Sequence, residues 1–83
     1  MLSKEPSSNE IKEEFYIMTI LDLIDGATYQ QLNEELKRYE EDEMYWQCAG
    51  IKKALDQSNY LTLKDLKEIA NEYYRNAAQL GGQ

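Results

Sequence analysis

The residues of this sequence whose type and spacing could do chemistry are carboxylates and a single thiol. The chain has 16 aspartates and glutamates, 9 lysines and arginines, and no histidine. The absence of histidine removes the commonest general base, every Ser–His or Cys–His nucleophile pair and most transition-metal sites. Asp22 is the carboxylate with the most apolar surroundings in the sequence, where burial could raise its pKa toward that of an acid–base catalyst. The ordinary alternative is a solvent-facing Asp22, and we expect no enzymatic activity.

Motifs for metals and cofactors are missing as well. Cys48 is the only cysteine, so neither an internal disulfide nor a thiolate zinc site can form. Placing Gly26 at the sixth position of an EF-hand loop puts Leu21 and Leu23 where oxygen ligands belong. The glycines do not form a phosphate-binding loop. The sequence therefore predicts no metal, no cofactor and no catalytic residue.

The densest group of charges lies in the middle of the chain and is relieved only by Lys37 and Arg38. Its carboxylates belong to Glu34, Glu35, Glu40, Glu41, Asp42 and Glu43. On a helix they spread over the side opposite Leu32 and Leu36, which is typical of a solvated face. The functional alternative is a carboxylate array that imitates the phosphates of nucleic acid and binds a basic groove on a partner protein.

Large aromatic side chains follow this acidic group directly. In "EMYWQCAGIKKAL", Met44, Tyr45 and Trp46 point to different faces of one helix, so they cannot all enter one small core. Trp and Tyr are favoured at the centres of protein interfaces. We therefore interpret Tyr45 and Trp46 as partner contacts, with core packing as the alternative for Trp46. Tyr74 joins them because it falls beside the apolar stripe of the last segment.

Helices must position these residues, because no region alternates apolar and polar residues with the period of a strand. The expected helices span residues 9–25, 28–57 and 62–80. Ser8 or Asn9 is the expected cap of the first helix. We predict an all-α bundle of three to four helices in one domain, residues 9–80, with flexible tails at 1–8 and 81–83.

The number of helices depends on the middle segment. Gly26 suits the left-handed residue that ends a helix, and Thr28 suits the cap of the next one. An apolar stripe then runs through residues 28–57, and we favour one continuous helix there. The alternative is a break near 38–42, with Asp42 as a fresh cap.

The segment "FYIMTILDLI", residues 15–24, is apolar nearly all the way round. Two other helices would leave a strip of it uncovered, and an isolated monomer would expose that strip. We therefore expect a homodimer formed through this helix. The residues assigned to the self-interface are Phe15, Tyr16, Ile17, Ile20, Leu23 and Ile24.

Composition narrows the class of protein further. A chain of 83 residues with a net charge of −7 forms one domain and repels nucleic acid and anionic membranes. The longest apolar stretch falls far below the roughly 20 residues that span a bilayer, and the N-terminus lacks the apolar core of a signal peptide. We expect a small cytoplasmic interaction module, a regulator or inhibitor of the kind that phages and mobile elements encode. Its partner would be a protein with a basic surface.

One pattern supports a different function. "ILDLIDGATYQQLNEEL" followed by "IKKALDQSNYLT" resembles the helix-turn-helix rhythm of winged-helix DNA-binding domains. The resemblance implies a DNA-associated transcriptional regulator. It departs from that pattern at "EEDEMYWQ", where the groove-reading helix would begin, since no Arg or Lys occurs there before Lys52. Such a regulator is the alternative to the interaction module, and direct binding to nucleic acid is not expected.

Overall fold

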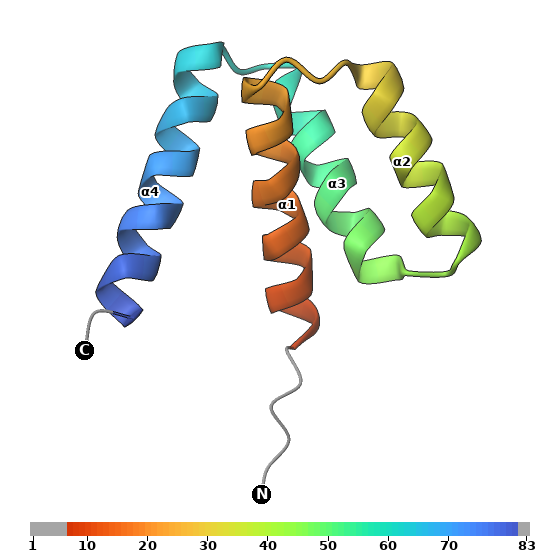
Figure 1. The fold of residues 1–83 in the computed structure, drawn as a ribbon, viewed down its shortest axis with the longest axis horizontal. Helices are drawn as coiled ribbons and strands as arrows, with labels where there is room; N and C mark the ends of the chain where they lie inside the picture. The colour runs from red at the N-terminus through yellow and green to blue at the C-terminus, as the bar shows by residue number, and fades with distance from the viewer. Residues whose placement is uncertain (1–6, 82–83) are drawn as a thin grey trace, which may run out of the picture.

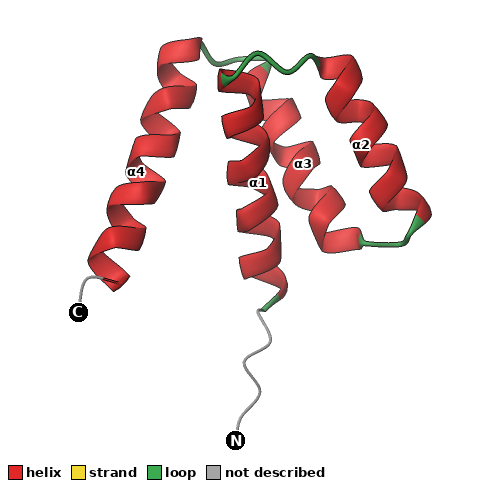
Figure 2. Cartoon of the chain, in the orientation of Figure 1, coloured by secondary structure: helices red, strands yellow, loops and turns green. Residues whose placement is uncertain are grey.

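The computed structural model describes residues 7–81. Four helices form this part of the chain and no strand occurs in it, which confirms the all-α prediction (Figures 1 and 2). They are α1 (Ser8–Ile24), α2 (Tyr29–Glu41), α3 (Tyr45–Ser58) and α4 (Leu63–Gly81). Most of the predicted tails, at 1–6 and 82–83, lies outside the described residues. Gly81, expected to start the C-terminal tail, is still helical.

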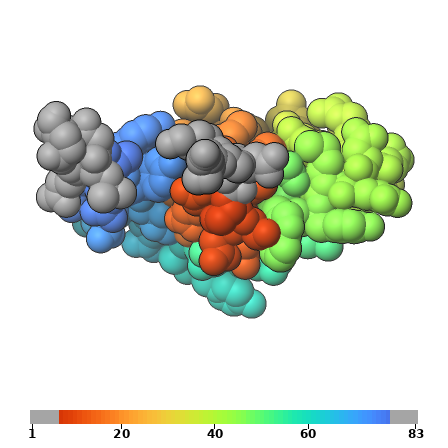
Figure 3. All heavy atoms as spheres, turned by 90° about the horizontal axis from the view of Figure 1, so that it is seen from below, coloured from red at the N-terminus to blue at the C-terminus, as the bar shows by residue number. Residues whose placement is uncertain are grey.

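The first helix lies at the centre of the bundle. It packs against α3 on one side and α4 on the other, and α2 packs only against α3 among its main contacts (Figure 1). Viewed from below, the first turns of α1 lie between α4 and the α2–α3 pair (Figure 3). The spatial order is therefore α4, α1, α3, α2, which differs from the order along the chain.

A side-chain cap begins α1 and a glycine turn ends it. The Ser7 hydroxyl accepts a hydrogen bond from the Glu10 amide at 3.1 Å, and the Glu10 carboxylate accepts one from the Ser7 amide at 2.8 Å. This is a capping box, placed one residue before the expected Ser8. The helix ends as predicted: Gly26 has a φ of 101°, and the Ala27 amide donates to the Asp22 carbonyl at 2.9 Å.

The continuous helix favoured for residues 28–57 is wrong, because α2 ends at Glu41 and α3 begins at Tyr45. Between them Glu43 adopts a φ of 58°, and the Met44 amide donates back to the Tyr39 carbonyl at 2.9 Å. These are the features of the left-handed stop that normally uses glycine. Asp42 ends α2 and does not cap α3.

Most of α1 is covered within a single chain. Ile20 is 0% exposed, and Tyr16 and Ile17 are also buried, in a core shared with Ala54 and Leu66. Half-buried side chains complete the cover of this helix, namely Phe15, Leu21, Leu23 and Ile24.

The expectation that two neighbouring helices would leave a broad apolar strip of α1 exposed is therefore wrong. Met18, 50% exposed, is the one large apolar side chain of α1 that the described structure leaves open. The residues assigned to a self-interface belong largely to the core of one chain. Self-association itself stays a prediction.

Close approach of α1 and α3 makes this cover possible. Gly50 of α3 lies directly against the backbone of α1. A Cβ atom at this position would overlap the carbonyl oxygen of Lys12 and would lie 2.9 Å from the Tyr16 nitrogen and 3.0 Å from the Phe15 Cβ. Because Lys12 and Tyr16 contribute backbone atoms here, no side-chain rotation can make room for it.

We predict that Gly50→Ala lowers the free energy of unfolding by about 2 kcal/mol, since the methyl group forces α1 and α3 apart. Helix propensity alone predicts the opposite sign, a gain of about 1 kcal/mol. Ala49→Gly, the reverse exchange one residue earlier, should cost about 1 kcal/mol through propensity. Urea unfolding followed by circular dichroism gives the free energy of unfolding of the two variants and the wild type. A Gly50→Ala variant more stable than the wild type would contradict the close contact.

We also predict that Glu43→Gly raises the free energy of unfolding by about 0.5–1 kcal/mol, because glycine adopts the left-handed conformation without a Cβ penalty. Gly26→Ala is the matched control: its φ of 101° disfavours alanine although open space surrounds the position. That substitution should lower the stability by about 1 kcal/mol. Equal stabilities for Glu43→Gly and the wild type in thermal unfolding would argue against the left-handed turn.

Candidate functional site

The α2–α3 turn brings acidic and aromatic side chains together at one corner of the bundle. We call this surface the acidic–aromatic corner and define it by Glu41, Asp42, Glu43, Tyr45 and Trp46. All five side chains are exposed, Tyr45 at 67% and Trp46 at 49%. The break between the helices creates the corner, because the carboxylates end α2 and form the turn while the aromatic residues begin α3.

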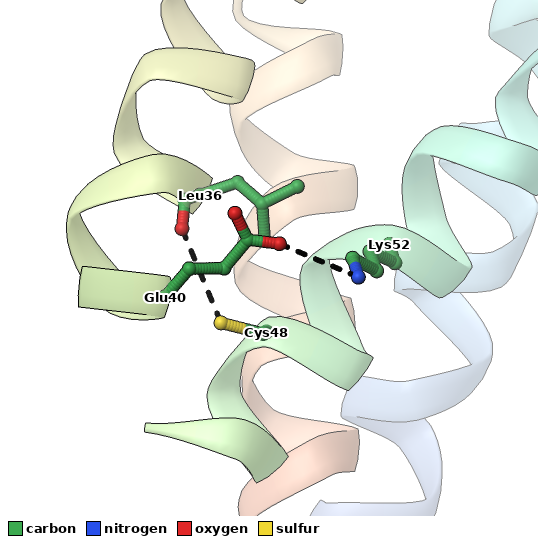
Figure 4. A network of polar contacts seen from close by, with 4 residues as sticks. All are labelled: Leu36, Glu40, Cys48 and Lys52. Atoms are coloured by element: carbon green, nitrogen blue, oxygen red, sulfur yellow. Dashed lines mark hydrogen bonds and ion pairs between the residues drawn. The ribbon is translucent and has the colours of Figure 1, made fainter. Parts of the chain in front are cut away.

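The six carboxylates predicted as one array divide into separate groups. Glu41, Asp42 and Glu43 belong to the corner. Glu40 points toward α3, where its carboxylate lies 3.4 Å from the Lys52 ammonium (Figure 4). The other two members lie earlier on α2, Glu34 exposed and Glu35 half-buried.

The contact between α2 and α3 also holds the single thiol. Cys48 is buried, and its sulfur lies 4.0 Å from the Leu36 carbonyl oxygen, which it can reach as a weak donor (Figure 4). Burial raises the pKa of the Cys48 thiol, and the negative charge of Glu40 raises it further. The positive charge of Lys52 lowers this pKa, but its effect is the smallest of the three. A buried thiol with a raised pKa is a poor nucleophile, so its role in this position is packing.

Tyr74 does not join the corner. It is exposed on α4, with its ring edge-to-face against Tyr73 at a centroid distance of 5.8 Å. Tyr74 and Trp46 belong to α4 and α3, which lie on opposite sides of α1 (Figure 1). The three aromatic residues expected to contact a partner are therefore divided between two helices that α1 separates.

Other exposed aromatic residues were not singled out from the sequence. Tyr60, in the connection between α3 and α4, is 87% exposed. Tyr29 begins α2, and its hydroxyl lies 2.7 Å from that of Ser58. The position of Tyr60 in the polar segment "DQSNY" was the available signal for its exposure.

An open groove of about 450 Å³ lies between α2 and α3 on the side of Tyr29. Its lining is Tyr29, Asn33, Leu36, Lys52, Leu55, Asp56 and Asn59. This lining combines apolar, amide and oppositely charged side chains, so it favours no single class of ligand.

The structure shows the surroundings of Asp22, the carboxylate considered as an acid–base catalyst. Asp22 is exposed on α1, and partial desolvation together with the neighbouring charge of Asp25 raises its pKa. An exposed carboxylate lacks the closed environment that general acid–base catalysis uses. Among the described residues, no three His, Cys, Asp or Glu side chains converge in a way that could hold a metal ion.

We predict that Cys48 reacts at least about 100-fold more slowly with Ellman's reagent in the folded protein than in the unfolded chain, because reaction requires the α2–α3 contact to open. The measurement compares the rate at pH 8 in buffer and in concentrated urea, with a small thiol as the reference for the effect of urea on the reagent. Similar rates in the two solutions would place the thiol at the surface.

No helix in the described part of the chain is long and apolar enough to cross a membrane. No protein-family model matches this chain, and comparisons with curated proteins and with solved structures found no match either. The assignment of a function therefore depends on the surfaces described above.

Proposed function

We propose that this protein is a small acidic interaction module that regulates or inhibits a partner protein by binding it, without catalysis. The observation that carries the proposal is the exposure of Tyr45 and Trp46 directly beside the carboxylates of Glu41, Asp42 and Glu43. Large aromatic side chains that stay outside a small core are typical of the centre of a binding surface.

The side chains of the corner indicate what kind of surface the partner would have. Carboxylates around an aromatic pair fit a surface where Lys and Arg side chains surround an apolar pocket. Trp46 would enter the pocket, and the acidic turn would orient the encounter and increase its rate at low salt. The net charge of −7 would also increase the rate of encounter with a basic partner. A cytoplasmic location, an origin in a phage or mobile element and a homodimeric state stay predictions.

A DNA-associated regulator has less support from the side chains. A carboxylate lies beside each lysine of α3 that could contact phosphate: the Lys52 ammonium is 3.4 Å from Glu40 and the Lys53 ammonium is 3.9 Å from Glu13. These exposed pairs are weak, but the carboxylates cancel the positive charge that would attract phosphate. A gel-shift titration with duplex DNA at low salt tests this alternative directly.

Photo-crosslinking tests the corner as the binding surface. We replace Tyr45 with the photoreactive aromatic amino acid p-benzoylphenylalanine in cells that naturally contain the protein. Tyr60 is the matched control, because it is also an exposed tyrosine but belongs to the α3–α4 connection. We expect irradiation to give a discrete adduct with another protein from position 45 and none from position 60. Adducts from both positions, or from neither, would contradict the proposal.

Charge reversal then tests the role of the carboxylates. Changing Glu41, Asp42 and Glu43 together to Lys should reduce the yield of the adduct at least about tenfold. The free energy of unfolding should stay within about 1 kcal/mol of the wild type. A control protein carries three reversals elsewhere, at Glu14, Asp22 and Glu68, all of them exposed. If both triple variants lose the adduct equally, general charge and not the corner would explain the binding.

A further inference from the structure

A second surface arises where α4 diverges from α1. The two helices lie closer together near the end of α1 and the start of α4, and farther apart toward the opposite ends (Figure 1). Leu66 and Ala70 are the buried residues of α4 among those whose burial is described, and both lie in its first half. The side chains from Tyr74 to Ala77 are all exposed. The segment of α4 from Tyr74 to Ala77 therefore has little cover from the described part of the chain.

A groove of about 200 Å³ lies between the two diverging helices. Its lining is Glu13 and Ile17 from α1 together with Ile69, Glu72, Tyr73 and Asn76 from α4. Ile17 is buried, and Ile69 and Tyr73 are half-buried, so these three form an apolar floor. Glu13 and Glu72 are exposed, and each helix thus contributes one carboxylate to the rim.

These carboxylates remain available to a ligand. Glu13 lies 3.9 Å from the Lys53 ammonium, but both side chains are about half exposed. Water therefore screens this pair, and Lys53 binds Glu13 only weakly. On α4, Asp65 and Glu68 precede Glu72 at helical spacing, which extends the negative charge along the same side of the helix. Lys67 falls on another side of α4, but Arg75 follows Glu72 by three residues and Lys64 precedes Glu68 by four, so these cations share the side of the carboxylates. Both cationic side chains are exposed, so water screens their attraction to Glu72 and Glu68 as it screens that of Lys53 to Glu13.

We propose that the α1–α4 groove binds a cationic amphipathic helix of a partner protein. Its apolar side chains would cover Ile17, Ile69 and Tyr73, and its Lys or Arg side chains would reach Glu13 and Glu72. A helix is the natural occupant because a groove between two helices accepts the apolar stripe of a third. A second copy of this chain is a poor occupant, since each copy carries a net charge of −7. The groove is separate from the acidic–aromatic corner, and this proposal does not depend on the function proposed for the corner.

The test uses a synthetic peptide of leucine and lysine with leucines at helical spacing, and a matched peptide in which glutamate replaces lysine. Amide chemical shifts of the labelled full-length protein are followed by NMR during titration. We expect the lysine peptide, and not the glutamate peptide, to shift the amides of Ile17, Ile69, Glu72 and Tyr73.

Paired variants separate specific binding from general charge attraction. Glu13→Gln with Glu72→Gln should weaken binding of the lysine peptide at least about fivefold, the effect expected for the loss of two exposed ion pairs. Glu34→Gln with Glu41→Gln removes the same charge from α2 and should change the affinity less than about twofold. Circular dichroism checks that both variants are folded.

Several outcomes would overturn the proposal. They are the absence of binding, shifts confined to the acidic–aromatic corner, equal weakening by both pairs of substitutions, and binding of both peptides. Concentration-dependent shifts of the groove amides without any peptide would show that a second copy occupies the groove, and this would also overturn it. Shifts at the corner alone would leave the function proposed for that surface intact, so the two proposals fail separately.

Discussion

The fold depends on the close approach of α1 and α3 at Gly50. With no Cβ at this position, the backbone of α3 lies against the Lys12 carbonyl and the Tyr16 amide nitrogen. One turn later, Ala54 is fully buried against the same side of α1. Two small residues on one face of α3 thus let an apolar helix sit close enough for its neighbours to enclose it. A third helix, α4, covers the opposite side of α1 through Leu66, with Ile69 and Tyr73 packed beside it.

Polar contacts around this crossing fix how the two helices are aligned. The Tyr16 hydroxyl donates to the side-chain carbonyl of Gln57 at 2.5 Å, and the Lys53 ammonium lies 4.4 Å from the centre of the Tyr16 ring. Burial, and secondarily the charge of Glu13, raises the pKa of the Tyr16 phenol. The Tyr16 phenol is therefore a weaker acid than an ordinary tyrosine and keeps the proton that it donates to Gln57. The core takes up most of α1, whereas Tyr45 and Trp46 of α3 stay exposed, and the proposed partner contact rests on these two side chains.

Local signals in the sequence predicted the caps and stops that use the usual residues. Gly26 ends α1, and Thr28 caps α2, where its hydroxyl accepts a hydrogen bond from the Gln31 amide at 3.1 Å. The sequence favoured an unbroken helix across the end of α2. The break was missed because Glu43 occupies the left-handed position, and glutamate gives no sequence signal for that conformation. The role of Gly50 was also missed, since only the position of α1 shows why a side chain is forbidden there.

The candidate sites, like the helix ends, could be predicted from the sequence only in part. The exposure of Tyr45 and Trp46 could be predicted from three large neighbours competing for one small core. Their grouping with only part of the acidic run could not, because it depends on where the turn falls. The α1–α4 groove was beyond prediction for a similar reason: it arises from the divergence of two helices that are far apart in the sequence.

The most direct measurement asks whether α1 is covered by its own chain. A mixture of isotope-labelled and unlabelled protein separates nuclear Overhauser effects within a chain from those between chains. We predict an effect between the α protons of Gly50 and the β protons of Phe15 within one labelled chain. If that effect appeared only between labelled and unlabelled chains, a second copy would cover α1, and the enclosure of this helix by α3 and α4 of the same chain would be wrong.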